Sequence, residues 1–297
     1  MTNQRICVTG ATGNVGLETL RELYSLTRNG TNTQLIAAVP SPDRARQTIA
    51  LENVEYRALD MMKPDKARFE EALEGVERLF LLRPPQISDV KRCIAPLVQA
   101  AKEVGVRHIV FLSLFGVEER KQTPHYAIEE LIRASGIEWT FLRPSFFMQN
   151  LSTTHREEIA TRGEIVVPAG NGATNFVDAK DIGKVAASVL ASPQAHLNTA
   201  YNLTGKLSYT YQEIASILSR ELGRSITYKQ PSKLTFFFRK VFRERLPVSF
   251  VLVMIYLYHQ TIIGKANGYS PDLERLLGNT PISFEEFAHR ERQTWIQ

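Results

Sequence analysis

Three glycines near the start of the chain have the spacing of a phosphate-binding loop. Gly10, Gly13 and Gly16 follow the apolar run 6–8 and precede a segment with helical periodicity. In such a loop the first glycine permits a tight turn, the second lets the backbone approach a pyrophosphate, and the third lets the helix pack on the strand. The helix N-terminus then presents free N–H groups and a positive dipole to the phosphates. We therefore predict dinucleotide binding, with a plain strand-to-helix turn as the alternative.

The residues after the second apolar run indicate which dinucleotide is bound. An acid at this strand tip would hold the ribose 2′-hydroxyl of NAD, whereas an arginine accommodates the 2′-phosphate of NADP. Residues 38–42 contain no acid, and Arg44 and Arg46 follow shortly after. We predict NADP, with NAD as the alternative, because Pro40 takes the most direct position and both arginines could be solvated helix residues.

One histidine is a candidate catalytic residue. His125 lies at the start of a predicted helix, and an imidazole titrates in the right range to donate a proton near neutrality. Glu129 follows one helical turn later, where it could pair with the ring. The alternative is a histidine that is only hydrogen-bonded or solvated. We predict no metal, because no His, Cys or Asp spacing resembles a metal site, and no Ser, His and Asp order favours hydrolysis.

The elements that must position these residues alternate between strands and helices. Six short apolar runs predict strands, and four of them are nearly continuous, as expected for strands covered on both faces. Helical patterns at 15–27, 89–103 and 124–135 lie among them. This alternation predicts an α/β fold with a doubly wound parallel sheet, the Rossmann arrangement. The six runs are residues 6–8, 35–39, 54–59, 79–82, 109–112 and 139–142.

The second half is less regular and predicts a smaller C-terminal substrate lobe. We expect an NAD(P)-binding domain at 1–150, with 176–205 returning to it as strand, helix and strand. Residues 151–175 and 206–297 would form the substrate or lid lobe. Within that lobe, residues 211–222 predict a helix that ends at Gly223, and a final helix begins at Ser283.

The excess positive charge is concentrated in one segment of this lobe. The whole chain has 36 basic and 31 acidic residues, whereas residues 224–246 hold seven basic residues and the single acid Glu244. The apolar stretch 247–258 follows and is too short to span a bilayer. One interpretation is a helix packed over the substrate cleft with its basic side chains in solvent. The other is a peripheral surface that contacts an anionic membrane.

Composition excludes several classes of protein. Hydrophobic residues make up 43% and charged residues 23% of the 297 residues, which are ordinary globular values. Cys7 and Cys93 are too few for a disulfide scaffold and indicate a reducing compartment. The N-terminal sequence lacks a signal-peptide pattern, so we predict a cytoplasmic protein. No nucleic-acid recognition motif is present, and no nucleic-acid partner is expected.

The chain resembles the NmrA-like family of atypical short-chain dehydrogenases over nearly its whole length. The glycine loop and a set of further motifs carry this resemblance. They are Val110-Phe-Leu-Ser-Leu-Phe-Gly116, His125-x-x-x-Glu129, Ser135-Gly-Ile-Glu-Trp-Thr-Phe-Leu-Arg-Pro144, Phe146-Phe-Met-Gln-Asn150, Asn175-Phe-Val-Asp-Ala-Lys-Asp-Ile182 and Tyr201-Asn-Leu-Thr-Gly205. The family includes NAD(P)H-dependent quinone and azo reductases, triphenylmethane reductases, and redox-sensing regulators that bind the cofactor without turning it over. The resemblance implies a Rossmann domain and a smaller lobe, with the substrate between them.

The predicted site residues follow from these patterns. Phe147 and Asn150 are expected to line the substrate pocket, with core packing as the alternative for Phe147. The predicted cofactor-binding residues are Gly10, Thr12, Gly13, Asn14, Val15, Gly16, Arg44, Asp60, Arg83 and Ser113.

The chain departs from the usual short-chain dehydrogenase motif Tyr-x-x-x-Lys, in which the lysine lowers the pKa of the tyrosine. Here Tyr126 is followed by Glu130 in the lysine position, and Leu114 stands where a second serine often occurs. A carboxylate would raise the pKa of Tyr126, so the usual tyrosine acid is not expected.

Hydride transfer to a quinone requires chiefly positioning, and protons can come from water. We predict an NAD(P)H-dependent oxidoreductase acting on a small quinone or similar aromatic acceptor. The main alternative is a non-catalytic NAD(P) sensor that controls a protein partner. A nucleotide-sugar epimerase is a third alternative, although its chemistry needs the missing tyrosine acid–base.

Overall fold

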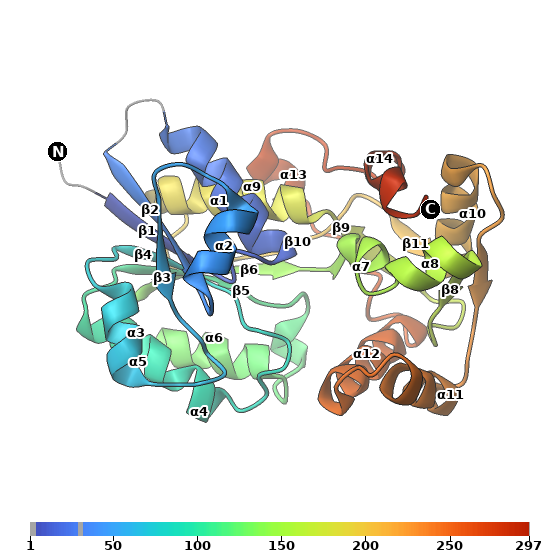
Figure 1. Ribbon diagram of the computed structural model, residues 1–297, viewed down its shortest axis with the longest axis horizontal. Coiled ribbons are helices and arrows are strands. Elements are labelled where there is room, and N and C mark those ends of the chain that lie inside the picture. Colours follow the sequence, from blue (N-terminus) through green and yellow to red (C-terminus); the bar gives the residue numbers. More distant parts are fainter. Residues whose placement is uncertain (1–3, 29–31, 297) are drawn as a thin grey trace. The chain divides into compact units, whose positions relative to one another are not determined.

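The apolar runs of the first half form a single parallel sheet in the computed structural model, which describes residues 4–28 and 32–296 (Figure 1). The strand order is β10-β6-β5-β4-β1-β2-β3, and every neighbouring pair is parallel. The predicted doubly wound sheet is confirmed. The strands are β1 (Gln4–Thr9), β2 (Thr33–Val39), β3 (Val54–Ala58), β4 (Arg78–Leu81), β5 (His108–Leu112), β6 (Glu138–Pro144) and β10 (Thr199–Leu203).

Helices cover both faces of this sheet (Figure 1). α1 and α9 pack together on one face, and α3, α5 and α6 form the layer on the other. The helices of this unit are α1 (Asn14–Thr27), α2 (Pro42–Ile49), α3 (Lys66–Leu73), α4 (Val90–Cys93), α5 (Ala95–Glu103), α6 (Pro124–Ser135) and α9 (Ala179–Ala191), with short 3₁₀ turns η1 (Val117–Glu119) and η2 (Pro193–Ala195).

Aligned side chains from neighbouring strands build the core under the second layer. Cys7 lies opposite Ile36 on one side and Leu79 on the other, and all three are buried in one cluster with residues of α3, α5 and α6. Burial raises the pKa of the Cys7 thiol to about 12, so this thiol is a packing group rather than a nucleophile. Cys7 and Cys93 are both free and buried.

The predicted helix at 89–103 is interrupted. The structure has α4 and α5 instead, and Ile94 between them is outside both helices. Pro96 lies in the first turn of α5. A proline lacks the N–H that would bond to the carbonyl four residues earlier, at Arg92, and its ring crowds that carbonyl. The helical pattern therefore continues while the hydrogen-bond ladder breaks.

The second unit contains two small sheets. In one, β9 pairs with β7 in parallel and with β11 antiparallel; in the other, β8 and β12 are parallel. Its strands are β7 (Phe146–Phe147), β8 (Glu164–Val166), β9 (Ala173–Val177), β11 (Ser208–Thr210) and β12 (Thr227–Lys229). Its helices are α7 (Gln149–Ser152), α8 (Arg156–Arg162), α10 (Tyr211–Leu222), α11 (Lys233–Phe238), the π-helix η3 (Arg239–Arg243), α12 (Val248–Ile262), α13 (Asp272–Leu277), α14 (Phe284–Glu291) and the 3₁₀ turn η4 (Arg292–Thr294).

Local signals placed two helices of this unit well. Gly223 ends α10 with φ of 63°, a left-handed conformation that glycine adopts without strain. Ser283 caps α14 and shares a capping box with Glu286, whose side chain accepts from the Ser283 backbone N–H. The last turn is held by Trp295, whose indole N–H donates to the carbonyl of Leu151 at 3.0 Å.

The chain divides into two compact units. The first comprises residues 1–144 and 179–203, and the second 145–178 and 204–297. The predicted boundary at residue 150 assigned Phe147 and Asn150 to the first domain, whereas both belong to the second unit. Among the described residues, no helix combines the length and apolar character needed to cross a bilayer.

Candidate active site

The glycine loop lies where the order of the sheet reverses. β1 has β2 on one side and β4 on the other, so the chain crosses to opposite sides of β1, and ligands of such sheets bind at this switch point. Thr9, the last residue of β1, links the end of β1 to the end of β4. Its hydroxyl donates to the carbonyl of Phe80 at 3.0 Å and accepts from the N–H of Leu82 at 2.9 Å.

The loop itself is a tight turn that glycine makes possible. Gly10 has φ of +58°, and the N–H of Gly13 donates to its carbonyl at 2.9 Å. A Cβ at Gly16 would lie 2.2 Å from the Gly10 carbonyl oxygen. Gly16 therefore permits the helix to pack against the loop backbone, rather than against the strand as predicted.

The first turn of α1 is available to an anion. Its N-cap residue, Gly13, makes no side-chain cap, and no acid lies in that turn. Free N–H groups and the helix dipole favour a negative group there. Gly10, Thr12, Gly13 and Asn14 are exposed, whereas Val15 and Gly16 are buried. Val15 is thus placed to offer its backbone rather than its side chain.

The two arginines after β2 are in different situations. Arg44 is exposed, and its side chain has no hydrogen-bond or ion-pair partner within residues 4–28 and 32–296. The guanidinium of Arg46 lies over the ring of Tyr56, 5.4 Å from its centroid. Arg44 is therefore the freer cation of the pair.

Two further predicted cofactor contacts, Asp60 and Arg83, are hydrogen-bonded within their own loops. The Asp60 carboxylate accepts from the N–H of Met62 at 2.9 Å. The Arg83 guanidinium donates through Nη1 to the carbonyls of Pro84, Pro85 and Ile87. Burial lowers the pKa of Arg83 to about 10, and the group remains charged at neutral pH. Arg83 thus shapes the loop after β4 through Nη1, while its buried Nε has no hydrogen-bond partner within the described residues.

The Ser113 hydroxyl, which was predicted to contact the cofactor, is part of a buried polar network. Ser113 donates to Glu129 at 2.5 Å, and Arg143 donates to both Glu129 oxygens at 3.0 and 2.7 Å. Arg133 adds a contact at 3.2 Å, and Arg143 also pairs with Glu118. Burial raises the pKa of Glu129, while the Ser113 and Arg133 contacts act in the opposite direction. The network joins α6 to the ends of β5 and β6.

The predicted His125–Glu129 pair is wrong. The Glu129 oxygens are occupied by the network, and the His125 ring instead faces Phe111, with centroids 6.2 Å apart. Burial, with a smaller contribution from the charge of Arg83, lowers the pKa of His125 to about 3. The expectation that it titrates near neutrality is therefore also wrong. At neutral pH the ring is uncharged, and it could serve as a hydrogen-bond donor but not as an acid of ordinary strength.

Glu130, which stands in the lysine position of the usual Tyr-x-x-x-Lys motif, is turned towards the surface. It is exposed and pairs with Arg133 at 2.6 Å. Its charge is therefore partly balanced by an arginine and screened by water.

The second unit contains a small cavity with a volume of about 100 Å³. Asn150 lines it, whereas Phe147 does not; its neighbour Phe146 takes that place. Successive side chains of a strand point to opposite faces, and the pattern of two adjacent phenylalanines could not distinguish them. The lining residues are Phe146, Asn150, Thr154, His155, Phe250, Val253, Met254, Leu257 and Tyr258.

A buried polar chain supports this cavity, and sequence analysis did not anticipate it. His155 contacts the Tyr258 hydroxyl at 2.7 Å and the Glu158 carboxylate at 2.6 Å. Lys240 and Arg239 donate to the other Glu158 oxygen at 3.4 and 3.2 Å. Burial opposes the charge of Glu158, but the His155 hydrogen bond and these cations lower its pKa overall. Burial also raises the pKa of Tyr258 well above its ordinary value.

The basic segment is thus partly internal. Lys240 is fully buried, and Arg224 donates to the carbonyls of Ile159, Ala160 and Trp295. The expectation that the basic side chains of this segment all lie in solvent is wrong for these two residues.

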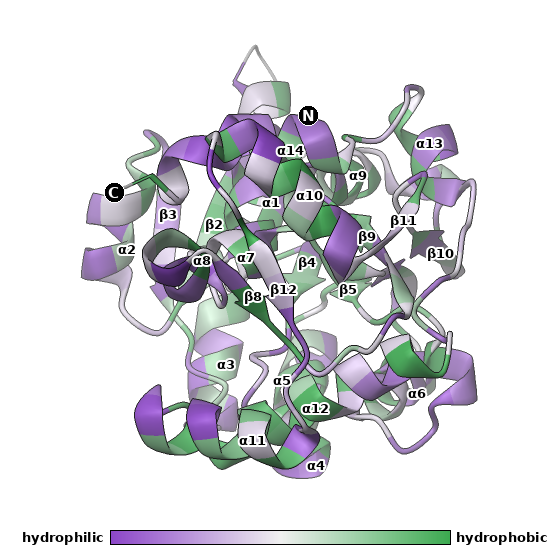
Figure 2. Cartoon of the chain, turned by 90° about the vertical axis from the view of Figure 1, so that its right-hand side faces the viewer, coloured by the Kyte–Doolittle hydropathy of each residue, from purple (hydrophilic) through white to green (hydrophobic). Residues whose placement is uncertain are grey.

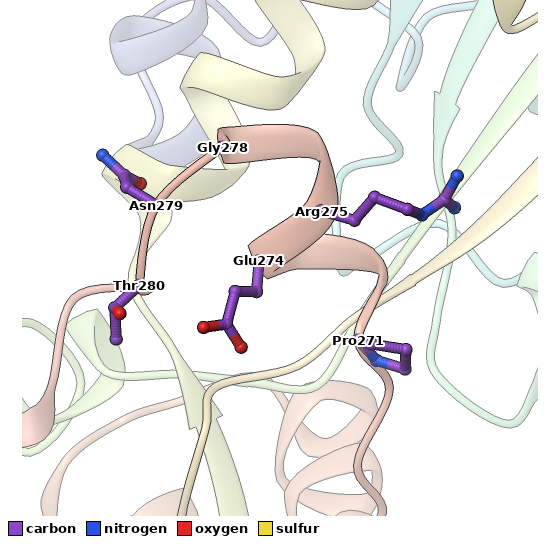
Figure 3. A pocket seen from close by; sticks show the side chains of 6 residues that line it. All are labelled: Pro271, Glu274, Arg275, Gly278, Asn279 and Thr280. Carbon is purple, nitrogen blue, oxygen red and sulfur yellow. The ribbon is translucent and has the colours of Figure 1, made fainter.

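A larger, open hollow of about 500 Å³ beside α13 lacks comparable features (Figure 3). Glu274 pairs with Lys206 and Arg275 with Asp272, and the Arg275 side chain points away from Glu274 (Figure 3). Its charged groups are therefore satisfied at the surface. The hollow is lined by Pro271, Glu274, Arg275, Gly278, Asn279 and Thr280.

Comparison with known proteins gives this geometry a family context. The model of the NmrA-like family matches residues 2–288. An NAD(P)H azoreductase of Xenophilus azovorans is 34% identical over 75% of this chain and 76% of its own length.

Two solved structures are similar over nearly the whole chain. The Citrobacter sp. triphenylmethane reductase complexed with NADP(H) has a TM-score of 0.80 and 28% identity, covering 97% of this chain and 99% of that one. The Escherichia coli NADPH-dependent quinone oxidoreductase complexed with NADPH has a TM-score of 0.81 and 25% identity, covering 96% and 99%.

Proposed function

We propose that this chain, which belongs to the NmrA-like family, catalyses the NAD(P)H-dependent reduction of a quinone or similar aromatic acceptor. The observation that carries the proposal is the exposed glycine loop at the switch point, followed by a helix N-terminus with no side-chain cap. The names of the three similar proteins refer to azo, triphenylmethane and quinone compounds. Such compounds share a conjugated system that accepts electrons, which supports the acceptor class.

The first unit would hold the cofactor at two places. Gly10 and Gly13 leave room for a pyrophosphate at the first turn of α1, where backbone N–H groups can donate to it. Arg44 would contact a 2′-phosphate, which favours NADP over NAD. When bound, the reduced nicotinamide supplies a hydride.

His125 is proposed to act as an uncharged hydrogen-bond donor. An imidazole whose pKa is lowered to about 3 keeps its N–H at neutral pH. A neutral imidazole can polarise a carbonyl oxygen through that N–H without becoming a charged acid. Protons for the reduced acceptor would then come from water, in agreement with the absence of a Tyr-x-x-x-Lys motif from the sequence.

The cavity of the second unit offers a surface for an aromatic ring. Phe146, Phe250 and Met254 provide apolar walls, and the Asn150 amide can donate to a carbonyl oxygen of an acceptor. An apolar pocket with one or two polar groups fixes orientation while favouring flat, weakly polar ligands. We propose this cavity as part of the acceptor site.

The test is oxidation of NADPH by the purified protein with a panel of quinones, an azo dye and a triphenylmethane dye. We expect continuous turnover with at least one acceptor, and faster turnover with NADPH than with NADH. Asn150→Ala should raise the KM for the acceptor several-fold while NADPH affinity stays unchanged. Leu207→Ser, an exposed position outside the cavity lining, serves as the control variant.

A second candidate function is a dinucleotide sensor that controls a protein partner. The observation that favours it is Glu130, which stands in the lysine position of the usual Tyr-x-x-x-Lys motif and pairs with Arg133 at the surface, so Tyr126 lacks the lysine partner of that catalytic pair. NADPH binding without oxidation by any acceptor in the panel would support this sensor and overturn the reductase. A cytoplasmic location remains a proposal, as does contact with an anionic membrane.

A further inference from the structure

The helical hairpin of the second unit, defined here as α11, η3 and α12 (residues 233–262), has apolar side chains on its outward face. Phe236 and Lys240 point inward and are fully buried. Leu234, Phe238 and Phe242 recur at four-residue spacing and are 66%, 50% and 67% exposed. The Phe238 and Phe242 rings stack with centroids 5.6 Å apart. A helix that only covers a core carries polar residues on its outer face, so burial within this chain does not explain these three.

The second helix of the hairpin shows the same property. Val251, Met254 and Tyr258 of α12 are buried, while Val248 and Leu252 are 49% and 53% exposed. Residues 248–258 contain no charged side chain. Where Figure 2 shows α11 and α12, green bands of apolar residues lie beside purple bands of hydrophilic ones. Exposed apolar surface of this kind marks contact with a partner or a membrane.

Positive charge borders this apolar face without matching acids. Lys233, Arg243 and Arg245 are exposed, and the two arginines have no ion-pair partner within the described part of the chain. Glu244 is the single acid in residues 233–262, and it is paired with Lys240 at 2.7 Å and Arg239 at 3.3 Å. The surface around the exposed rings is therefore cationic.

We propose that the hairpin docks on an anionic lipid bilayer. Leu234, Phe238 and Phe242 enter the boundary between headgroups and acyl chains, and Lys233, Arg243 and Arg245 contact lipid phosphates. Apolar burial together with basic charge is the physical basis of such interfacial attachment. A second copy of the chain fits this face less well, because a two-fold contact would bring the same cations together.

The cavity indicates why docking on a bilayer would help the protein, and this part of the inference rests on the proposed function. Val253 lines the cavity with Asn150 and is itself 38% exposed on α12. An apolar acceptor dissolved in the bilayer would therefore meet the cavity beside the docked helix. Docking itself is independent of whether the protein reduces an acceptor.

Sedimentation of the full chain with lipid vesicles tests the proposal. Vesicles of phosphatidylcholine alone are compared with vesicles that also contain phosphatidylglycerol, at low and high salt. We expect binding to the anionic vesicles at low salt and release at high salt. The variant Phe238→Ser/Phe242→Ser and the variant Arg243→Gln/Arg245→Gln should each weaken binding at least tenfold. Phe242→Trp should show a blue shift of tryptophan emission when anionic vesicles are added.

Matched controls separate this surface from general stickiness. Leu207→Ser removes an equally exposed apolar side chain elsewhere in the unit, and Lys91→Gln/Arg92→Gln removes two exposed cations of α4; both should bind vesicles like the wild type. Absence of binding at low salt, equal binding to neutral vesicles, or a dimer that Phe238→Ser/Phe242→Ser dissociates would each overturn the proposal. Turnover of a water-soluble quinone by the same variants reports on the proposed function separately, and should be unchanged.

Discussion

Among the residues that the structure describes, each unit contains one buried glutamate surrounded by cations, and the two glutamates serve different parts of the fold. Glu129 joins strand ends of the parallel sheet through Ser113 and Arg143, which lie 16 and 14 residues from it in sequence. Glu158 instead anchors the helical hairpin through Arg239 and Lys240, 81 and 82 residues away. A network among neighbouring elements stabilises the edge where we place the cofactor, whereas the long-range one holds a helix whose outer face remains apolar.

This difference explains why apolar patterns in the sequence identify buried residues in the first unit but not in the hairpin of the second. In the first unit the apolar runs are strands covered on both faces, so an apolar residue in them is a buried residue. In the hairpin, apolar residues point both inward and outward, and a buried lysine lies among them. The inward charge is satisfied by Glu158, which leaves the outward cations free for a partner.

Removing Glu129 should give the largest loss of stability. In Glu129→Ala the buried Ser113 and Arg143 lose their common acceptor, and breaking a buried ion pair in this way costs about 3–5 kcal/mol of unfolding free energy. The exposed Glu130→Ala is the control and should cost below about 1 kcal/mol. Urea unfolding of both variants measures the difference. Equal losses would mean that the network contributes no more than a surface pair.

The corresponding change in the second unit should cost less. Lys240→Met removes one buried cation, but Glu158 keeps His155 and Arg239 as partners, so we expect a loss of about 2 kcal/mol in the free energy of unfolding. The same urea series measures it. A loss as large as that of Glu129→Ala would identify Lys240 as the dominant partner of Glu158.

Much of the fold and part of the site followed from local pattern. The sheet, the family and the glycine loop depend on short-range features, namely continuous apolar runs and one loop motif, and these expectations were confirmed for the fold and the family. The break at Ile94 was missed because its cause, Pro96, lies within an otherwise helical pattern. The protonation of His125 and the burial of Lys240 depend on side chains brought near by tertiary packing, which no local spacing contains.

The two units also differ in whether their cations are available to a ligand. Arg44 of the first unit has no partner within the described residues, whereas Lys240 of the second unit is buried and paired inside that unit. Arg44→Ala should weaken NADPH binding by about 1.5 kcal/mol, roughly tenfold, because a charge-assisted contact to the 2′-phosphate is lost. NADH binding should not change. Calorimetric titration with both cofactors checks this, and an equal loss for NADH would place Arg44 elsewhere than at the 2′-phosphate.

The effect that is smallest at neutral pH concerns His125, an uncharged ring in the first unit. Its folded-state pKa of about 3 lies below its ordinary value of 6.5. Between these values the unfolded chain binds more protons than the folded one, so the wild type loses stability as pH falls. His125→Asn lacks this penalty, and should gain at most about 1.4 kcal/mol relative to the wild type for each pH unit below that ordinary value. Unfolding at about pH 7 and about pH 5 measures the slope; parallel slopes would show that the ring is protonated in the folded state.

The most direct test of the central claim is calorimetric titration of NADPH into the wild type and Gly13→Val. Gly13 has φ of −88° and ψ of 171°, a backbone conformation that valine also adopts, and a Cβ there would meet the Gly10 carbonyl oxygen at 3.3 Å. This contact is tight, and the loop backbone must move by a few tenths of an ångström to relieve it. The variant should therefore fold, with a urea midpoint only slightly below that of the wild type, while its side chain fills the space for the pyrophosphate. We predict one NADPH per wild-type chain and affinity at least about a hundredfold weaker in the variant. Equal affinity in the two proteins would contradict the assignment of the loop as the cofactor site.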